Sequence, residues 1–277
     1  MSRVWLITGS NRGLGRAFAE KAASLGDKVI AGTRKIDLGD DFYQNENVLP
    51  VKMDVTNPQE ISEAVQAGAK RFGSIDILIN NAGYGISGAF EEVSEKNLRQ
   101  LFETDYFGMT RVIRAVLPIM RRQRSGRILS VASQAGVMGF LGSSAYCSAK
   151  FAVVGLTQAL REELAPFGIQ VSVICPGSFR TDFRDKSSMQ FADKEIADYK
   201  DSNVHRASLF LKEHNHRQEG DPGKAASFVA EILSREILPK RIMIGKNCCT
   251  AVRDDLERQI EEIDSYQKKS SMTDFME

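Results

Sequence analysis

The chain has no apolar run long enough to cross a membrane and no excess of charge of either sign. None of its uninterrupted apolar stretches approaches the roughly 20 residues of a membrane-spanning helix. Its 37 basic and 36 acidic residues nearly cancel, which removes the electrostatic argument for binding nucleic acid or an anionic membrane. The first ten residues lack the apolar core and cleavage site of a secretory signal, so we expect a cytoplasmic protein.

Cysteine and histidine are also scarce. Four cysteines in 277 residues do not make a disulfide framework, and no two of them form a C-x-x-C pair. His205, His214 and His216 fall in a polar segment. The letters HNH at 214–216 have no accompanying acidic and histidine ligands, so we interpret them as a solvated helix or loop rather than as a nuclease or metal site. We expect no bound metal.

Short apolar runs alternate with longer amphipathic stretches along most of the chain. This alternation is typical of a parallel sheet with helices on both faces. We predict an α/β fold with a Rossmann-type doubly wound sheet of about seven strands, in a single domain over residues 1–277. The expected strands are 3–9, 28–34, 48–55, 75–83, 126–133, 169–177 and 241–245, and the expected helices are 14–25, 58–71, 94–122, 144–168, 221–236 and 250–268.

Two regions depart from the alternation. Residues 179–219 are polar and irregular, with scattered apolar side chains. We expect this segment and the loop 134–145 to form the walls of a substrate site. Residues 246–277 are predicted to form a charged helical extension.

A glycine-rich turn, TGSNRGLG at 8–15, follows the first expected strand and opens the first expected helix. Glycines allow the backbone to bend tightly here, and they let a pyrophosphate approach main-chain N–H groups at the positive end of the helix. The spacing differs from the commonest G-x-G-x-x-G fingerprint. The strand–turn–helix context nevertheless favours a nucleotide-binding turn over a purely structural one.

The stretch SSAYCSAK at 143–150 places Tyr146 four residues before Lys150. On a helix these two positions share one face. A neighbouring ammonium favours the ionised phenol, which makes the tyrosine a better proton donor and acceptor near neutral pH. Because Y-x-x-x-K is common in helices, its meaning depends on the other motifs.

Four motifs in chain order resemble those of the classical short-chain dehydrogenase/reductase family. They are T-G-x-x-x-G-x-G at 8–15, NNAG at 80–83, Ser133 with Y-x-x-x-K thirteen residues later, and P-G-x-x-x-T within PGSFRT at 176–181. The resemblance covers roughly residues 3–245. It implies a Rossmann fold, a nicotinamide cofactor and hydride transfer between a carbonyl and an alcohol.

The resemblance also implies roles for individual residues. Tyr146 would exchange a proton with the substrate oxygen, Lys150 would lower the pKa of that tyrosine and hold the nicotinamide ribose, and Ser133 would hydrogen-bond the substrate oxygen. The residues expected at the cofactor are Gly9, Ser10, Arg12, Gly13, Leu14, Gly15, Thr33, Arg34, Asp54, Val55, Asn81, Ala82, Gly83, Tyr146, Lys150, Pro176, Gly177, Phe179 and Thr181.

One position departs from the family pattern. Many classical members carry N-x-x-G in the long helix, where the asparagine joins a proton relay through a bound water. This chain has DYFG, which puts Asp105 there. An ionised aspartate cannot donate a hydrogen bond, and its charge near Lys150 would weaken the effect of the lysine on Tyr146. We expect Asp105 to belong to the catalytic site and to tune Tyr146.

The end of the second expected strand predicts the choice of cofactor. It reads GTRK, with Thr33 and Arg34 where NAD-binding enzymes usually carry an acid for the ribose 2′-hydroxyl. Arg12 lies in the neighbouring turn, and two converging guanidinium groups would suit a 2′-phosphate. We therefore predict NADP(H), the alternative being that both arginines are solvated surface residues. Asp54 matches the family's acceptor for the adenine amino group.

The sequence thus predicts an NADP(H)-dependent carbonyl reductase or alcohol dehydrogenase for a hydrophobic ketone or secondary alcohol, similar to the hydroxysteroid dehydrogenases. One alternative is a non-enzymatic NADP(H)-binding regulator, which the intact Ser133, Tyr146 and Lys150 argue against. Others are an NAD(H)-dependent alcohol dehydrogenase of the same family and an extended-branch epimerase or dehydratase, whose T-G-x-x-G-x-x-G this sequence lacks. We expect a homodimer or homotetramer paired through helices 94–122 and 144–166, by analogy with the family.

Overall fold

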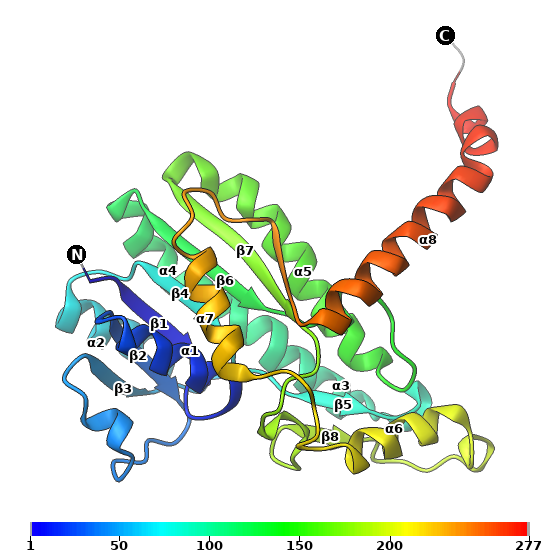
Figure 1. The fold of residues 1–277 in the computed structure, drawn as a ribbon, viewed down its shortest axis with the longest axis horizontal. Coiled ribbons are helices and arrows are strands. Elements are labelled where there is room, and N and C mark those ends of the chain that lie inside the picture. The colour runs from blue at the N-terminus through cyan, green and yellow to red at the C-terminus, as the bar shows by residue number, and fades with distance from the viewer. Residues whose placement is uncertain (1, 276–277) are drawn as a thin grey trace.

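The computed structural model of the protein describes residues 2–275. Its centre is a seven-stranded sheet in the order β3-β2-β1-β4-β6-β7-β9, with each strand parallel to its neighbours (Figure 1). The predicted Rossmann-type doubly wound sheet is confirmed. The strands are β1 Val4–Thr8, β2 Lys28–Thr33, β3 Val48–Lys52, β4 Ile77–Asn80, β6 Gly126–Val131, β7 Ile169–Pro176 and β9 Arg241–Ile244.

Helices cover both faces of this sheet because successive strand residues are apolar on both sides. Leu6 packs in the core cluster that includes α2 (Pro58–Phe72), α4 (Met109–Gln123) and α5 (Ser144–Leu164). The next residue, Ile7, packs in a second cluster with α1 (Gly13–Ser24) and α7 (Pro222–Ile232), which lie side by side in Figure 1. Alternate side chains of a strand point to opposite faces, so both faces are buried.

The long helix predicted over 94–122 is interrupted. It consists of α3 (Glu95–Phe102), a π-helical turn η3 (Glu103–Gly108) and then α4. A π-turn carries one residue more than a regular turn and often occurs at functional sites. Here the turn contains Asp105, whose buried carboxylate contacts Tyr84 and Lys150. Local periodicity could not predict a turn that depends on these partners.

The segment 179–219 is more regular than predicted. It contains β8 (Met189–Phe191), which pairs in parallel with β5 (Gly85–Ser87), and helix α6 (Asn203–Glu213). β8 has three residues and a partner about a hundred positions away, so its pattern is too short to be recognised. The remaining short 3-10 turns are η1 Asp41–Gln44, η2 Phe90–Glu92, η4 Gln134–Gly136, η5 Ala165–Phe167, η6 Asp182–Arg184, η7 Ala197–Tyr199 and η8 Ser271–Thr273.

The C-terminal extension forms α8 (Lys246–Ser270), a helix that begins earlier than the predicted 250–268. It leaves the body of the molecule beyond α5 and projects away from it (Figure 1). Within residues 2–275, none of the helices combines the length and the apolar character that crossing a membrane would require.

Candidate active site

The motifs meet at the carboxyl edge of the sheet, where β1 and β4 end. Thr8 closes β1, and its Oγ1 accepts hydrogen bonds from the backbone N–H groups of Asn81 (2.9 Å) and Ala82 (3.0 Å). The Asn81 amide in turn donates to the carbonyls of Thr8 (3.1 Å) and Gly9 (3.2 Å). The side chain of Asn81, which we expected at the cofactor, therefore joins the NNAG turn after β4 to the glycine turn after β1. The sequence did not reveal that Thr8 also joins these two turns.

The glycine turn needs its glycines for two different reasons. Gly9 and Gly13 have φ values of 66° and 57°, in the left-handed region that side chains rarely adopt. Gly15 is required by packing, since a Cβ there would lie 2.2 Å from the carbonyl oxygen of Gly9. A Cβ at Gly13 would lie 3.5 Å from the Cβ of Thr181, so the P-G-x-x-x-T segment lies beside this turn.

The first turn of α1 fits a pyrophosphate. Its N-cap residue, Arg12, makes no side-chain capping bond, and the first turn has no acidic residue. By contrast, Asn57 caps α2 and Asp221 caps α7 through their side chains. An uncapped helix N-terminus offers free N–H groups and a positive dipole end to an anion.

Ser133, Tyr146 and Lys150 come from two neighbouring elements. Ser133 follows β6, and its Oγ accepts from the N–H of Ala135 at 3.1 Å. Tyr146 and Lys150 lie one turn apart on α5, with the lysine Nζ 5.6 Å from the centre of the tyrosine ring. The same Nζ donates to the carbonyl oxygen of Val131 at 3.3 Å. The predicted proximity of tyrosine and lysine is present in the structure.

Asp105 is the second contact of this lysine. Its Oδ2 lies 2.9 Å from Nζ of Lys150, and the two side chains are 0% and 6% exposed. Its Oδ1 accepts from the N–H of Tyr84 at 3.0 Å. The absence of a side chain at Gly83 provides the space for this carboxylate, because a Cβ there would lie 2.9 Å from Oδ2. The buried carboxylate thus lies against the NNAG turn and pairs directly with Lys150.

The charges of these groups act on one another. Burial raises the pKa of Tyr146; the Lys150 ammonium lowers it, the Asp105 carboxylate raises it, and the Ser133 side chain lowers it, leaving it above the ordinary value. Burial would lower the pKa of Lys150, but Asp105 and Tyr146 raise it above that of a free lysine. Burial raises the pKa of Asp105 despite the opposing charge of Lys150. Asp105 therefore opposes the effect of Lys150 on the pKa of Tyr146, and burial outweighs the lowering expected from the lysine.

The residues expected around the adenosine ribose are not all oriented as predicted. Thr33 is buried and its Oγ1 donates to the carbonyl of Lys35 at 3.1 Å, whereas Arg34 is exposed. Arg12 donates to the hydroxyls of Ser187 (2.5 Å) and Ser188 (2.6 Å). This contact with the 179–219 segment differs from the expected convergence with Arg34.

Other expected cofactor residues have structural contacts of their own. Ser10 is buried and its Oγ donates to the carbonyl of Gly32 at 3.2 Å. Asp54 accepts from the Thr56 N–H at 2.9 Å. Pro176 is the last residue of β7, and the N–H of Gly177, the next residue, donates to the carbonyl oxygen of Ile244 at 2.9 Å. Three further expected residues pack in the hydrophobic core: Leu14, Val55 and Phe179.

An ion pair between Arg16 of α1 and Asp40 holds the loop after β2 against that helix, and the sequence did not reveal it. Arg16 makes two contacts with the carboxylate of Asp40, one of them 2.9 Å long, and lies over the ring of Phe42. The Arg16 guanidinium lowers the pKa of Asp40 to about 2. The partners are 24 residues apart, and no local pattern links them.

A buried glutamate, Glu92, anchors the 179–219 segment. Its Oε1 accepts from the N–H of Ile196 at 3.0 Å, its Oε2 lies 2.8 Å from Nε2 of His205, and its carbonyl accepts from Lys194 at 3.1 Å. Phe183 of the same segment places its ring centre 6.0 Å from that of Tyr146. Phe183 therefore brings this segment beside the tyrosine, and its role as a wall of the substrate site stays a prediction.

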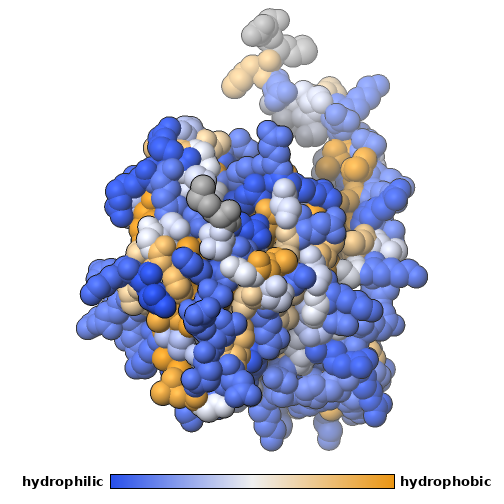
Figure 2. All heavy atoms as spheres, turned by 60° about the vertical axis from the view of Figure 1, so that its left-hand side comes forward, coloured by the Kyte–Doolittle hydropathy of each residue, from blue (hydrophilic) through white to orange (hydrophobic). Residues whose placement is uncertain are grey.

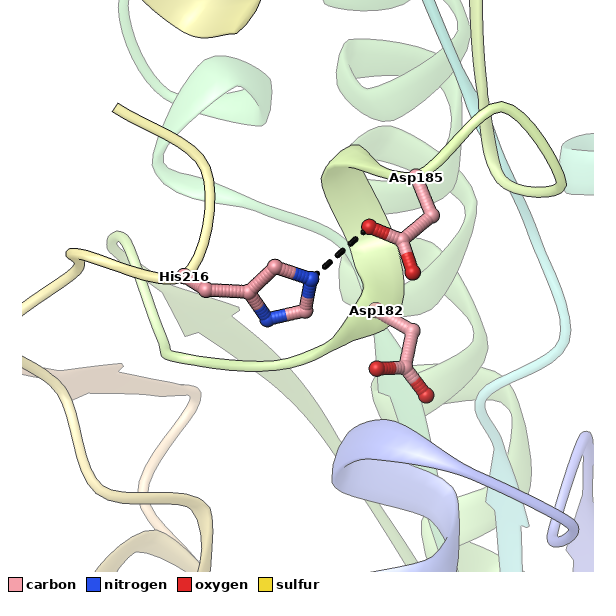
Figure 3. A group of neighbouring side chains, drawn as sticks. All are labelled: Asp182, Asp185 and His216. Carbon is pink, nitrogen blue, oxygen red and sulfur yellow. Dashed lines mark hydrogen bonds and ion pairs between the residues drawn. The ribbon is translucent and has the colours of Figure 1, made fainter. Parts of the chain in front are cut away.

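A small polar cluster that includes His216 lies where the two ends of this segment meet. The side chains of Asp182, Asp185 and His216 offer ligand atoms within 4.8 Å of one another (Figure 3). Within the cluster, Nε2 of His216 lies 2.9 Å from Oδ1 of Asp185, which also accepts from the Asn215 amide at 2.6 Å. His214 stacks on Phe210, with ring centres 3.9 Å apart. The contacts of Asp185 with Asn215 and His216 connect the two ends of the segment.

Fold and site together define a nucleotide-binding Rossmann domain with a tyrosine–lysine pair at its carboxyl edge. The family model of the short chain dehydrogenases matches residues 3–191. The chain is 39% identical over 248 residues to the oxidoreductase BOA17 of Botryotinia fuckeliana, covering 88% of this chain and 89% of that protein. The chain therefore belongs to the short-chain dehydrogenase family of oxidoreductases.

Solved structures support the same assignment. A short-chain dehydrogenase from Streptomyces avermitilis superposes with a TM-score of 0.91 at 36% identity, covering 99% of this chain and 100% of that one. One from Burkholderia phymatum, solved in complex with NAD, has a TM-score of 0.79 at 27% identity, covering 93% and 95%. ElxO, solved with NADP bound, has a TM-score of 0.73 at 25% identity, covering 90% and 100%. Both nucleotides thus occur among similar structures.

Proposed function

We propose that this chain is an NADP(H)-dependent oxidoreductase that interconverts a ketone or aldehyde and an alcohol. The observation that carries the proposal is the arrangement of Ser133, Tyr146 and Lys150 at the carboxyl edge of the sheet. The lysine ammonium is fixed by the Val131 carbonyl and by Asp105, and it lies on the same face of α5 as the tyrosine ring.

The roles of Ser133, Tyr146 and Lys150 follow from the protons and the charge that their side chains carry. The nicotinamide cofactor supplies or accepts the hydride when it is bound. In the reducing direction the Tyr146 hydroxyl gives its proton to the carbonyl oxygen, and the Ser133 hydroxyl donates a hydrogen bond to that oxygen as charge develops on it. The positive charge of Lys150 stabilises the resulting tyrosinate. In the oxidising direction the tyrosinate removes the proton of the alcohol.

The cofactor is proposed from the groups that surround its expected position. The uncapped N-terminus of α1 would hold the pyrophosphate, and the exposed Arg34 would pair with a 2′-phosphate. No acidic residue ends β2, where a free ribose hydroxyl would be recognised. NAD(H) is the second candidate. Arg12, one of the two arginines expected at the 2′-phosphate, instead donates to Ser187 and Ser188, which leaves only Arg34 for the phosphate.

The substrate is proposed to be a hydrophobic ketone or secondary alcohol. Phe183 stands beside Tyr146, and a Cβ at Gly85 would lie 2.9 Å from the terminal methyl carbon of Met189 and 3.3 Å from Phe183. Phe183 therefore lies beside the tyrosine, and Met189 of the same segment packs near Gly85, close to Phe183. An apolar wall of this kind favours binding of a hydrocarbon skeleton.

The test is a panel of ketones and aldehydes, followed by consumption of NADPH, with wild type and Tyr146→Phe. The phenylalanine keeps the ring and removes the proton, so turnover should fall by about 10²–10⁴ while NADPH affinity stays nearly unchanged. A variant that turned over an accepted substrate at the parent rate would refute the role of Tyr146. Binding of NADPH without turnover of any carbonyl compound would favour the regulator instead.

A further inference from the structure

The turn formed by residues 185–188 lies against the glycine turn through Arg12. Nη1 of this arginine donates to the hydroxyl of Ser187 at 2.5 Å, and its Nη2 donates to the Ser187 carbonyl oxygen at 3.1 Å and to the hydroxyl of Ser188 at 2.6 Å. Ser187 lies 175 residues beyond Arg12 in the chain. A guanidinium presents several N–H donors in one plane, so it can bind two neighbouring residues at once. Arg12 therefore joins the start of α1 to the 179–219 segment.

An arginine near the surface would ordinarily point into water. The face of the molecule in Figure 2 is largely hydrophilic, with hydrophobic residues scattered among hydrophilic ones. Arg12 is nevertheless only partly exposed, and Ser188 is buried. None of the ion pairs within residues 2–275 includes Arg12. Hydrogen bonds from a charged donor are roughly twice as strong as neutral ones, so three such bonds are suited to fixing the position of the turn.

Backbone hydrogen bonds make the turn compact and join it to β5. The carbonyl oxygen of Asp185 accepts from the N–H groups of Ser188 and Met189, both at 2.8 Å. The carbonyl oxygen of Ser188 accepts from the N–H of Gly85 at 2.9 Å. The carboxylate of Asp185 contacts the far end of the segment. The turn is therefore held by β5, by the far end of its own segment and by Arg12.

The turn also sets the position of an aromatic ring beside the candidate catalytic tyrosine. Phe183 lies two residues before the turn, with its ring centre 6.0 Å from that of Tyr146. Met189 directly follows the turn. A Cβ at Gly85 would lie 2.9 Å from the terminal methyl carbon of Met189 and 3.3 Å from Phe183, so both side chains pack at the same place on β5. A shift of the turn would therefore move Phe183 relative to Tyr146.

We propose that Arg12 is a positioning residue for the 179–219 segment rather than a contact of the 2′-phosphate. Its guanidinium holds the 185–188 turn against the glycine turn, and the turn keeps Phe183 beside Tyr146. Loss of this contact releases the turn and loosens the apolar side of the substrate site, while the choice between NADPH and NADH depends on Arg34. The effect on the substrate rests on the proposed function, whereas the effect on the turn does not.

Two substitutions of Arg12 separate the proposed role from binding of a phosphate. Arg12→Ala removes both the charge and the hydrogen bonds. Arg12→Lys keeps the charge, which a phosphate accepts from a single ammonium, but the lysine lacks the planar fork that reaches both serines. The variant with Ser187→Ala and Ser188→Ala removes two of the three acceptors. Arg235→Ala, at an exposed arginine far along the chain, is the matched control.

Hydrogen exchange of the backbone amides in residues 184–191, with no nucleotide or substrate added, measures the turn directly. The exchange rate follows the free energy of local opening. Arg12→Ala should increase it by roughly ten- to a hundred-fold, as the loss of charged hydrogen bonds predicts, and Arg12→Lys nearly as much. The serine variant should increase it by less, because the Ser187 carbonyl remains as an acceptor. The control should exchange like the wild type, and the variant combining Arg12→Ala with both serine substitutions should exchange no faster than Arg12→Ala alone.

Nucleotide binding and kinetics then distinguish the two roles of Arg12. Titration of both Arg12 variants with NADPH and NADH should give the same ratio of affinities as the wild type, in contrast to Arg34→Ala. With a carbonyl compound that the wild type accepts, KM should rise several-fold. The value of kcat should stay close to that of the wild type, because the proton donor Tyr146 is unchanged.

Three results would overturn the proposal. Wild-type exchange in folded Arg12→Ala protein would show that other contacts hold the turn. Faster exchange in the combined variant than in Arg12→Ala would show that the arginine and the serines act separately. A loss of NADPH affinity in Arg12→Ala, with unchanged NADH affinity and recovery in Arg12→Lys, would assign Arg12 to the 2′-phosphate. If no carbonyl compound reacts, the proposed function fails, and amide exchange alone decides whether Arg12 holds the turn.

Discussion

The ammonium of Lys150 lies 2.9 Å from a carboxylate oxygen of Asp105, and both side chains are almost completely buried. Each charge is held by the other in a region from which water is excluded, so removing one partner leaves the other uncompensated. The lysine therefore acts on two neighbours at once, Asp105 and Tyr146. With the asparagine that many family members carry at this position, the lysine charge would act on the tyrosine without an opposing carboxylate.

Replacement of Asp105 by asparagine should shift the pH dependence of turnover. The carboxylate raises the pKa of Tyr146, so Asp105→Asn should lower that pKa and move the pH profile of kcat/KM to lower pH in both reaction directions. Glu103→Gln, which neutralises a partly exposed carboxylate two residues away, is the control and should leave the profile in place. Complete loss of activity in folded Asp105→Asn protein would instead make the carboxylate essential.

The NADP(H) proposal predicts a specific loss at Arg34. Arg34→Ala should weaken NADPH binding by roughly ten- to a hundred-fold, as expected for about 1.5–3 kcal/mol per charged hydrogen bond, and leave NADH binding nearly unchanged. Lys35→Ala removes the same charge from the adjacent exposed position and should have a much smaller effect. Titration of both reduced nucleotides at matched ionic strength measures this, and NADH binding as tightly as NADPH in the wild type would disprove the preference.

Loss of the Glu92 carboxylate should loosen the wall of the substrate site. Glu92→Ala leaves the Ile196 N–H and His205 without their acceptor, so the segment around residues 194–205 should become more sensitive to limited proteolysis and KM should rise. Glu95→Ala, at an exposed carboxylate on α3, should change neither. Equal proteolysis of the two variants would mean that other contacts hold the segment.

The same anchor has a defined pH dependence. Burial alone would raise the pKa of Glu92, but hydrogen bonds from Ile196 and His205 bring it below the ordinary value. The carboxylate therefore stabilises the segment above the pKa of an unfolded glutamate, and this stabilisation is lost only as the pH falls through the lowered folded value. Proteolytic sensitivity of the wild type should thus increase in acid and stay constant through neutral pH.

Two glycines on helices should respond in opposite directions to alanine. Gly15→Ala places a methyl 2.2 Å from the Gly9 carbonyl oxygen and should destabilise the fold by about 1–3 kcal/mol. Gly155→Ala meets no atom within 4 Å on α5 and should stabilise it by about 0.5–1 kcal/mol. Urea unfolding compares the two, and similar destabilisation by both would contradict the packing at Gly15.

The sequence predicted the features that depend on neighbours along the chain. Apolar strands such as 3–9 revealed the sheet, and the spacing of Tyr146 and Lys150 placed them on one face of α5. Contacts between distant residues were missed, because no local pattern encodes them. The π-turn around Asp105, the strand β8 and the bonds from Arg12 to Ser187 and Ser188 each need a partner supplied by the fold.

The pairing of β8 with β5 has a consequence for how this site can change over evolutionary time. Backbone hydrogen bonds hold residues 189–191 against residues 85–87, and these bonds do not depend on which side chains the strand carries. Mutation can therefore alter the apolar side chains at Met189 and Phe191 while the strand stays in register. A protein built in this way can acquire a new substrate without rebuilding the scaffold that holds Tyr146.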